Sequence, residues 1–253
     1  MDFSEFHYKT AIHLASQISN EIYGINELYP SAFFELDDAG FQNKIIQPNR
    51  QTLLHEYIAF IHEDSLEYWI RKMGYAPIID EVIDALNFYE VDYPKLNEDY
   101  NGSDDDDGLY EVIIQRYNTL TSQIANETFT ILFNDKRLMR DFNQSISEII
   151  CKMKKDDFPE LLKKDGVLYR CAYLPKWLKD GIFFRDKGRC QLCGKDLTHL
   201  LSSNNSIHYD HIIPLELGGS NDPTNFQILC EGCNTSKGAR HCGTRNLVQV
   251  FWK

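Results

Sequence analysis

A chain of 253 residues, 43% of them hydrophobic, is long enough to bury the core of one large domain or of two smaller ones. No apolar run approaches the roughly 20 residues that a membrane-spanning helix needs. The N-terminal stretch MDFSEFHYKT also lacks the basic and apolar regions of a secretory signal. We therefore expect a cytoplasmic protein without a membrane partner. The net charge of -12 argues at first against a nucleic-acid partner as well.

The charge is unevenly distributed along the chain. Residues 167–253 carry 11 Lys and Arg against 7 Asp and Glu, a net of +4, which leaves a net of -16 for residues 1–166. Such a change of sign is typical of two domains with different partners. A solvated acidic surface explains the negative half equally well, because net charge reports on solubility and not on fold.

The first half of the chain has the apolar periodicity of helices. Apolar residues recur three and four positions apart between Ala11 and Ile22, and again between Leu54 and Ile61. The segment APIIDEVIDALNFY repeats this spacing, with Pro77 placed to begin a helix. These patterns predict a mainly α-helical N-terminal region.

A polar tract interrupts the helical pattern. The stretch NEDYNGSDDDDG at 97–108 is typical of a loop or linker. Helix is predicted to resume after it and to continue to about residue 155, although the β-branched residues at 128–133 leave a strand open. No chemical motif occurs in residues 1–165, so we predict an acidic helical domain that serves partner binding, self-association or regulation.

The sequence changes character at Pro175, which can open a short helix that ends near Gly188. A cysteine pair follows, then a polar loop at 198–207 and the strand-like stretch YDHIIPLELGG at 209–219. A second loop, the apolar strand FQILC and the helix start EGCNTSKGAR complete the order. With the helical first half, this order predicts an α+β protein whose second domain spans residues 166–253.

Seven cysteines occur in the chain, six of them in its last third. Cys190 and Cys193 form one C-x-x-C pair, and Cys230 and Cys233 form another after a gap of 36 residues. Two such pairs provide four thiolates for a tetrahedral Zn²⁺ ion, whereas a redox dithiol or unrelated buried cysteines are the alternatives. A site closed by four cysteines has no open position for a substrate, so we predict a structural zinc.

The gap between the cysteine pairs contains a second polar set. Asp210 and His211 stand side by side in an otherwise apolar stretch, where two ionisable groups are costly unless something binds them. Asn225 follows later in the gap, and Asn234 comes directly after the last cysteine. Folding of the cysteine frame is expected to bring the strand of Asp210 and His211 against the helix of Asn234.

These residues carry a family resemblance. The pattern D-H-I-I-P, an Asn 14 residues after the His, and C-x-x-C-N-x-x-K-G resemble the HNH endonucleases over about residues 170–240. The resemblance implies their small ββα-metal (His-Me finger) fold. The third position is Asn234 and not His, which is similar to the HNN variant in the nuclease domains of some RNA-guided effectors.

The resemblance implies a role for each central residue. His211 resembles the general base, because a neutral imidazole can take a proton from water near pH 7. Asp210 and Asn234 resemble the ligands of one catalytic ion, and their oxygen donors suit Mg²⁺ or Mn²⁺. Asp210 and His211 are neighbours on a strand and would point to opposite faces. They can share one site only if the strand bends or the site lies across its edge.

The remaining positions are implied to support the reaction. Asn225 would hold the His211 ring in its useful tautomer or pin the loop through backbone groups. Lys237, three residues after Asn234 on the same helix face, is expected to meet a DNA phosphate. Arg189 is a further candidate for the DNA backbone, although a solvated surface position is the alternative.

Two functions of different classes remain after these observations. The first is a DNA endonuclease that leaves 5′-phosphate and 3′-hydroxyl ends. The second is a zinc-stabilised adaptor without catalytic activity that binds nucleic acid or protein. Small HNH proteins with an unrelated helical half resemble bacterial restriction and anti-phage effectors and mobile-element nucleases. From this habit of the family we expect residues 1–165 to bind a protein partner or to self-associate.

Overall fold

The computed structural model describes most of the chain, namely residues 6, 9–24, 33–35, 38–95, 107–198 and 206–247. Most of the tract at 97–108 and most of the polar loop at 198–207 lie outside these residues. The chain divides into two compact units, Met1–Ser16 with His55–Phe129, and Gln17–Leu54 with Thr130–Lys253. The division into residues 1–165 and 166–253 stays a prediction, and the two units do not follow it, because they interleave along the chain.

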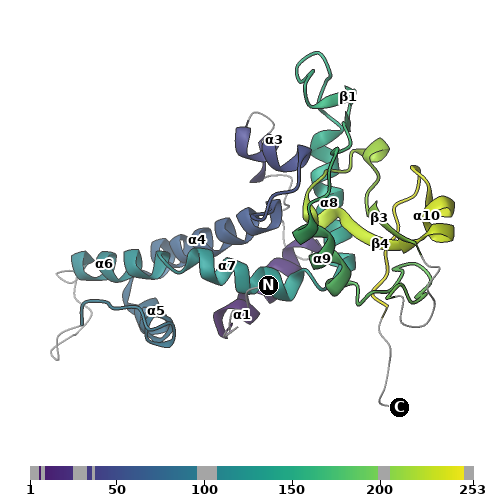
Figure 1. The fold of residues 1–253 in the computed structure, drawn as a ribbon. Coiled ribbons are helices and arrows are strands. Elements are labelled where there is room, and N and C mark those ends of the chain that lie inside the picture. Colours follow the sequence, from purple (N-terminus) through teal and green to yellow (C-terminus); the bar gives the residue numbers. More distant parts are fainter. Residues whose placement is uncertain are drawn as a thin grey trace. The chain divides into compact units, whose positions relative to one another are not determined.

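The first unit is helical (Figure 1). It contains the beginning of α1 (Lys9–Ile22) and most of α4 (Leu53–Met73), with α5 (Ala76–Phe88), α6 (Asp107–Asn118) and most of α7 (Thr121–Leu132). Helices α5 and α6 pack against each other. The strand left open at 128–133 does not form, because α7 covers most of that segment. Ile124 and Thr128, four residues apart on one helix face, are both fully buried.

The second unit combines helices with two small antiparallel strand pairs. Its helices are α3 (Ala39–Ile46), α8 (Lys136–Ile150), α9 (Lys176–Arg185) and α10 (Glu231–Lys237), with the 3₁₀ turns η2 (Leu215–Leu217) and η3 (Pro223–Asn225). Asp38 and Asp135 cap α3 and α8 by accepting backbone N–H bonds. Pro175 precedes α9, as predicted.

The strand pairs are β1 (Leu162–Lys164) with β2 (Val167–Leu168), which the sequence did not predict, and β3 (Ile207–His211) with β4 (Phe226–Cys230). In the β3–β4 hairpin Ile207 lies opposite Cys230, and His211 lies opposite Phe226. Helix α9 packs on β4 around a core that includes Ile182 and Ile228.

The α+β fold class is confirmed, with helices predominating in the first half of the chain and the strands, the β3–β4–α10 succession and the cysteine frame near its C-terminal end. No helix within the described ranges is both long and apolar enough to cross a membrane.

Candidate active site and metal cluster

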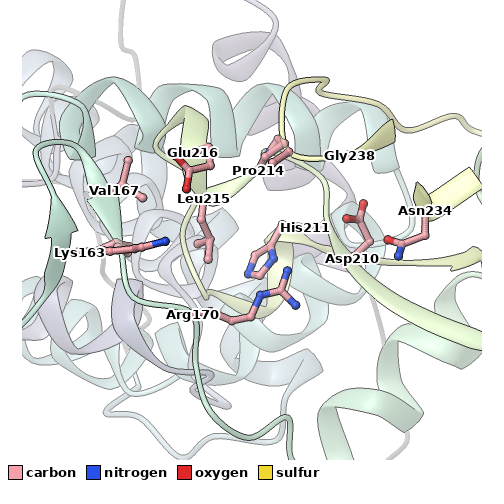
Figure 2. Close-up of a pocket in the computed structure, with 12 residues that line it drawn as sticks. Lys163, Val167, Arg170, Asp210, His211, Pro214, Leu215, Glu216, Asn234 and Gly238 are labelled. Atoms are coloured by element: carbon pink, nitrogen blue, oxygen red, sulfur yellow. The ribbon is translucent and has the colours of Figure 1, made fainter. Parts of the chain in front are cut away.

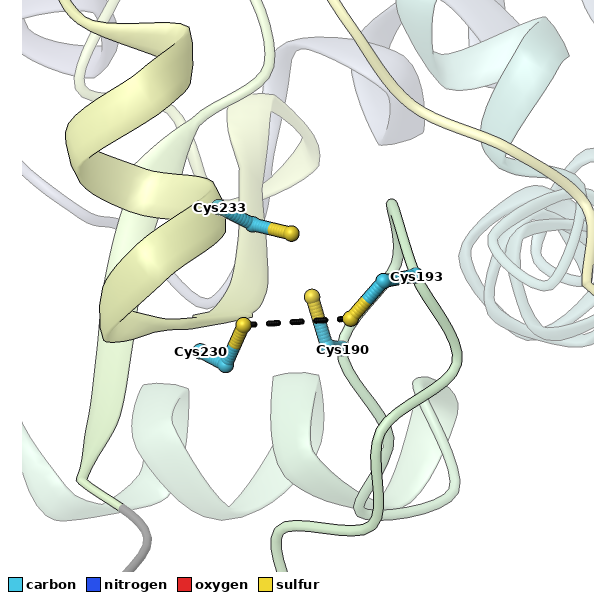
Figure 3. A group of neighbouring side chains, drawn as sticks. All are labelled: Cys190, Cys193, Cys230 and Cys233. Carbon is cyan, nitrogen blue, oxygen red and sulfur yellow. Dashed lines mark hydrogen bonds between the residues drawn. The ribbon is translucent and has the colours of Figure 1, made fainter.

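The four predicted cysteines lie together beside the beginning of α10 (Figure 3). Their Sγ atoms are all within 4.8 Å of one another, and those of Cys193 and Cys230 are 3.8 Å apart. A tetrahedral zinc with bonds of about 2.3 Å separates its sulfur ligands by about 3.8 Å, so the cluster fits one such ion. The first pair is shaped by a tight turn in which the Gly194 N–H donates to the Cys190 carbonyl, and Gly194 has a φ of +76°.

The Cys190 side chain suits a metal ligand in its thiolate form. Burial raises the pKa of this thiol, but hydrogen bonds from the backbone at Cys230, Cys193 and Leu192 outweigh burial and lower the pKa to about 7. Backbone N–H groups that point at a sulfur stabilise its anion, which is the form that binds metal.

A cavity of about 480 Å³ lies at the other end of the β3–β4 hairpin (Figure 2). It brings together Asp210, His211 and Asn234, three of the predicted site residues. Asp210 and His211 both reach it because His211 is the last residue of β3 and the chain bends at the next residue. The cavity therefore lies across the end of the strand, so the two neighbours need not point to one face.

The His211 ring is nearly sealed from solvent, at 2% exposure. It packs against the Phe226 ring at a centroid distance of 4.4 Å, and its Nε2 lies 3.1 Å from Oδ1 of Asn221. Burial lowers the pKa of His211 to about 3, with further lowering by the positive charges of Arg170 and Lys237. The imidazole is therefore neutral near pH 7, as a proton acceptor must be.

Asp210 is held on one side by two donors. Its Oδ2 accepts from Lys237 Nζ at 2.9 Å and from Gln227 Nε2 at 3.1 Å. Its Oδ1 makes no hydrogen bond within the described part of the chain, and the Asn234 side chain makes none there either. One carboxylate oxygen and one amide oxygen that line the same cavity therefore fit a hard divalent cation such as Mg²⁺ or Mn²⁺.

Lys237 is not an exposed residue on the face of α10. It is buried, and its ammonium group donates to the His211 carbonyl at 2.6 Å as well as to Asp210. In this arrangement Lys237 ties α10 to the end of β3, and its contact with a DNA phosphate stays a prediction.

The hydrogen bonds of Asn225 are those that the second of its two predicted roles requires, and the role itself stays a prediction. Its Nδ2 donates to the carbonyls of Ile213 and Ser220 at 3.0 and 2.8 Å, and its Oδ1 accepts from the Ile213 N–H at 2.8 Å. These bonds pin the loop between β3 and β4. The His211 ring is contacted instead by Asn221, which the sequence analysis did not single out.

Arg189 lies away from the cavity of His211. Its Nη1 donates to the Gly194 carbonyl at 3.2 Å, and it borders a separate hollow of about 240 Å³. The neighbouring Arg185 is buried and paired with Asp186 at 2.8 Å, so it supports the fold. A DNA contact of Arg189 stays a prediction, and the structure does not group Arg189 with the other site residues.

The sequence analysis missed Arg170 and Lys163, which line the cavity and supply positive charge to it. Lys163 lies on β1, and Arg170 follows the end of β2. Neither belongs to a motif, and Arg170 lies 20 residues before Cys190, the first cysteine of the cluster. Arg170 belongs to the basic part of the chain, whose net charge does not distinguish one residue from another, and Lys163 lies in the part that is acidic overall.

Residues 190–240 match the family model described as HNH endonuclease. This match confirms the resemblance for that part of the chain, which holds both cysteine pairs and the Asp210, His211, Asn225 and Asn234 set. Comparison with curated proteins gave no match, and comparison with solved structures gave none either. The matched residues form an HNH domain in which the cysteine cluster and the cavity occupy opposite ends of one hairpin.

Proposed function

We propose that the protein is a metal-dependent HNH endonuclease that hydrolyses phosphodiester bonds of DNA. The observation that carries this proposal is that Asp210, His211 and Asn234, which all lie within the residues that match the HNH family, line one and the same cavity. The cysteine cluster would hold a structural zinc that fixes the β3–β4–α10 unit. Its distance pattern supports zinc, and its four protein ligands leave no position for a substrate.

In the proposed reaction His211 acts as the general base. Its neutral ring takes a proton from a water molecule, whose oxygen forms the new bond to phosphorus while the bond to the 3′ oxygen breaks. The leaving oxygen takes a proton from solvent, so the products carry 5′-phosphate and 3′-hydroxyl ends. Asp210 and Asn234 would hold a Mg²⁺ or Mn²⁺ ion, which when bound supplies positive charge for the scissile phosphate and the leaving oxygen.

Arg170 also affects how basic the His211 imidazole is. Its positive charge lowers the pKa of His211 in the free protein. A phosphate bound beside Arg170 would neutralise much of that charge and make the imidazole more basic when substrate is present. Arg170 and Lys163 are therefore the side chains that we assign to the substrate phosphates, from their place in the cavity.

The experiment incubates supercoiled plasmid with the purified protein and Mg²⁺ or Mn²⁺, with an EDTA control. We expect nicked or linear DNA only with a divalent cation, and weaker cleavage by Asp210→Ala with partial recovery at high Mn²⁺. A matched single-stranded RNA tests the assignment to DNA. If the protein binds DNA but leaves it intact under all these conditions, the adaptor function replaces the nuclease.

We further infer that the helical part of the chain recruits a partner or a second copy of the chain. A single Asp210–His211–Asn234 set attacks one phosphodiester at a time, so two strands require two sites or rebinding. Helix α4 supports this inference with large exposed side chains at Tyr68, Trp69 and Met73. A role in restriction or defence against phage follows from the family habit alone. Light scattering of the purified chain tests self-association, and purification from the native host tests a partner.

A further inference from the structure

Asn221 is a fully buried residue in the loop between β3 and β4, and its side-chain amide is completely hydrogen-bonded. Its Nδ2 donates to the carbonyls of Ile46 and Tyr169, at 3.1 and 2.9 Å. Its Oδ1 accepts from the Cys171 backbone N–H at 3.3 Å and faces Nε2 of His211 at 3.1 Å. An amide group has two donor hydrogens and two acceptor positions, so no capacity remains.

Three backbone groups decide which way this amide points. If the oxygen and nitrogen were exchanged, the oxygen would face the Ile46 and Tyr169 carbonyls, and the NH₂ group would face the Cys171 N–H. Acceptor would meet acceptor and donor would meet donor at a buried site, which is strongly unfavourable. The orientation is therefore set without reference to His211.

The fixed amide in turn decides the tautomer of His211. A neutral imidazole carries its proton on one nitrogen and a lone pair on the other. Because Nε2 faces an oxygen that can only accept, Nε2 must carry the proton. Nδ1 then holds the lone pair, and it makes no hydrogen bond within the described residues.

We propose that Asn221 is the positioning residue that holds neutral His211 in its Nε2–H tautomer and leaves Nδ1 as the atom that accepts the proton. Its catalytic meaning rests on the proposed nuclease function. The partners of Asn221 come from two other segments of the second unit, residues 45–46 and 169–171. The Asn221 backbone N–H adds a bond to the first of them, because it donates to the Ile45 carbonyl at 2.8 Å. The end of α3 thus helps to orient the ring of the base.

The first experiment reads the tautomer directly. Protein labelled with ¹⁵N-histidine is studied by two-dimensional NMR at neutral pH, without DNA and without added Mg²⁺ or Mn²⁺, and His211 is assigned by comparison with His211→Gln. We expect a protonated Nε2 that exchanges slowly with solvent and an unprotonated Nδ1. A proton on Nδ1 in the wild-type protein overturns the proposal, whatever the cleavage assay shows.

The second experiment compares variants. Asn221→Leu should give a mixture of His211 tautomers. It should also cleave about 10- to 100-fold more slowly, which is the usual loss when a residue that orients a site residue is removed. Asn221→Ala, which removes the same acceptor with a smaller side chain, should also give a mixture of tautomers. An unchanged single Nε2–H tautomer in folded Asn221→Leu contradicts the proposal.

Asn143→Leu is the matched control. Asn143 is also a buried Asn, and its Nδ2 donates to Thr224 of the same loop at 3.0 Å, but none of its hydrogen bonds is to His211. This variant should lose stability and keep the Nε2–H tautomer. If Asn221→Leu does not fold, the wild-type spectrum and Asn221→Ala still decide the proposal: an unchanged single Nε2–H tautomer in folded Asn221→Ala contradicts it. A protein that has the expected tautomer but cleaves nothing refutes the nuclease function and leaves the tautomer assignment standing.

Discussion

The two ends of the β3–β4 hairpin are held by different means. At the Cys230 end four side chains from two short C-x-x-C segments converge, and a single metal ion can join them. At the His211 end the loop at 212–225 is held by hydrogen bonds to residues far away in the chain. In the metal cluster the stabilising free energy comes from a few local ligands, whereas the loop is stabilised by hydrogen bonds with many distant backbone groups.

The loop at the His211 end is a buried polar network. Asn221, Asp222, Thr224 and Asn225 are each fully buried. The Asp222 carboxylate accepts from the Leu53 N–H at 2.9 Å and from the Thr224 N–H and hydroxyl at 2.9 and 2.6 Å. Burial raises the pKa of Asp222 to about 6, while these donors oppose that rise. Such a network specifies one loop conformation only while every member keeps its partner.

The largest expected effect follows from loss of the cysteine cluster. Cys190→Ser or Cys233→Ser should abolish tight metal binding and unfold the hairpin and α10, because metal binding contributes folding free energy of about 10 kcal/mol or more in small zinc domains. Elemental analysis should find close to one zinc per wild-type chain and none in the variants. Folded, active wild-type protein without zinc would contradict this half of the comparison.

Removal of the Asp222 carboxylate tests how the loop at the His211 end is held. Asp222→Ala leaves three buried donors without an acceptor and should reduce the free energy of unfolding by about 2 to 4 kcal/mol. Cleavage should slow as well, since Asn221 and the base are fixed by the same loop, but zinc content should not change. Urea unfolding measures the stability loss.

Asp38→Ala provides the control for this measurement. Asp38 also accepts two backbone N–H bonds, at the beginning of α3, but it is exposed. Its loss should cost only about 1 kcal/mol, as for an ordinary helix cap. Equal losses in the two variants would mean that the loop is not the sensitive network that the contacts describe.

The helical unit offers a third, smaller contrast, because it buries an imidazole of its own at His62. His62 bonds Tyr117 at 3.0 Å and lies 3.3 Å from the Thr121 hydroxyl, and burial lowers its pKa to about 4. Between pH 6.5 and 4 the unfolded chain binds a proton that the folded chain does not. Stability should therefore fall with falling pH, and by about 2 kcal/mol at pH 5 from this group.

His62→Gln should remove that part of the pH dependence without affecting DNA cleavage at neutral pH. Urea unfolding at pH 7 and pH 5 gives the difference between wild type and variant. An identical loss of stability in both proteins on acidification would show that His62 is not the group that titrates.

The contrast between the two ends also explains what the sequence could reveal. The cysteine pairs, Asp210, His211 and Asn234 were predictable because their spacing is local and repeats a known pattern. Strands β3 and β4 and helix α10 followed from short apolar runs and from the placement of the second cysteine pair, whereas β1 and β2 were not predicted. The α-helical reading of residues 76–89 was confirmed for the same reason, since a periodic apolar face needs no distant partner.

The partners of the loop could not be read from the sequence. Asn221 sits in the stretch GGSNDPTN, whose composition indicates a turn but not the carbonyls of Ile46 and Tyr169 that it binds. Helical spacing placed Lys237 on the face of Asn234 but could not show that its ammonium group reaches the His211 carbonyl. The contribution of residues 17–54 to the second unit depends on contacts that no local pattern encodes.

The central claim is that the cavity at the His211 end is catalytic, and the most direct measurement compares two histidines of the same strand. His208 lies on β3 outside the residues that line the cavity, with its Nε2 3.0 Å from the Ser206 hydroxyl. In a single-turnover cleavage assay with Mg²⁺ or Mn²⁺, His211→Ala should be slower than wild type by about 10²- to 10⁴-fold, while His208→Ala should match wild type. Cleavage by His211→Ala at the wild-type rate would contradict the account.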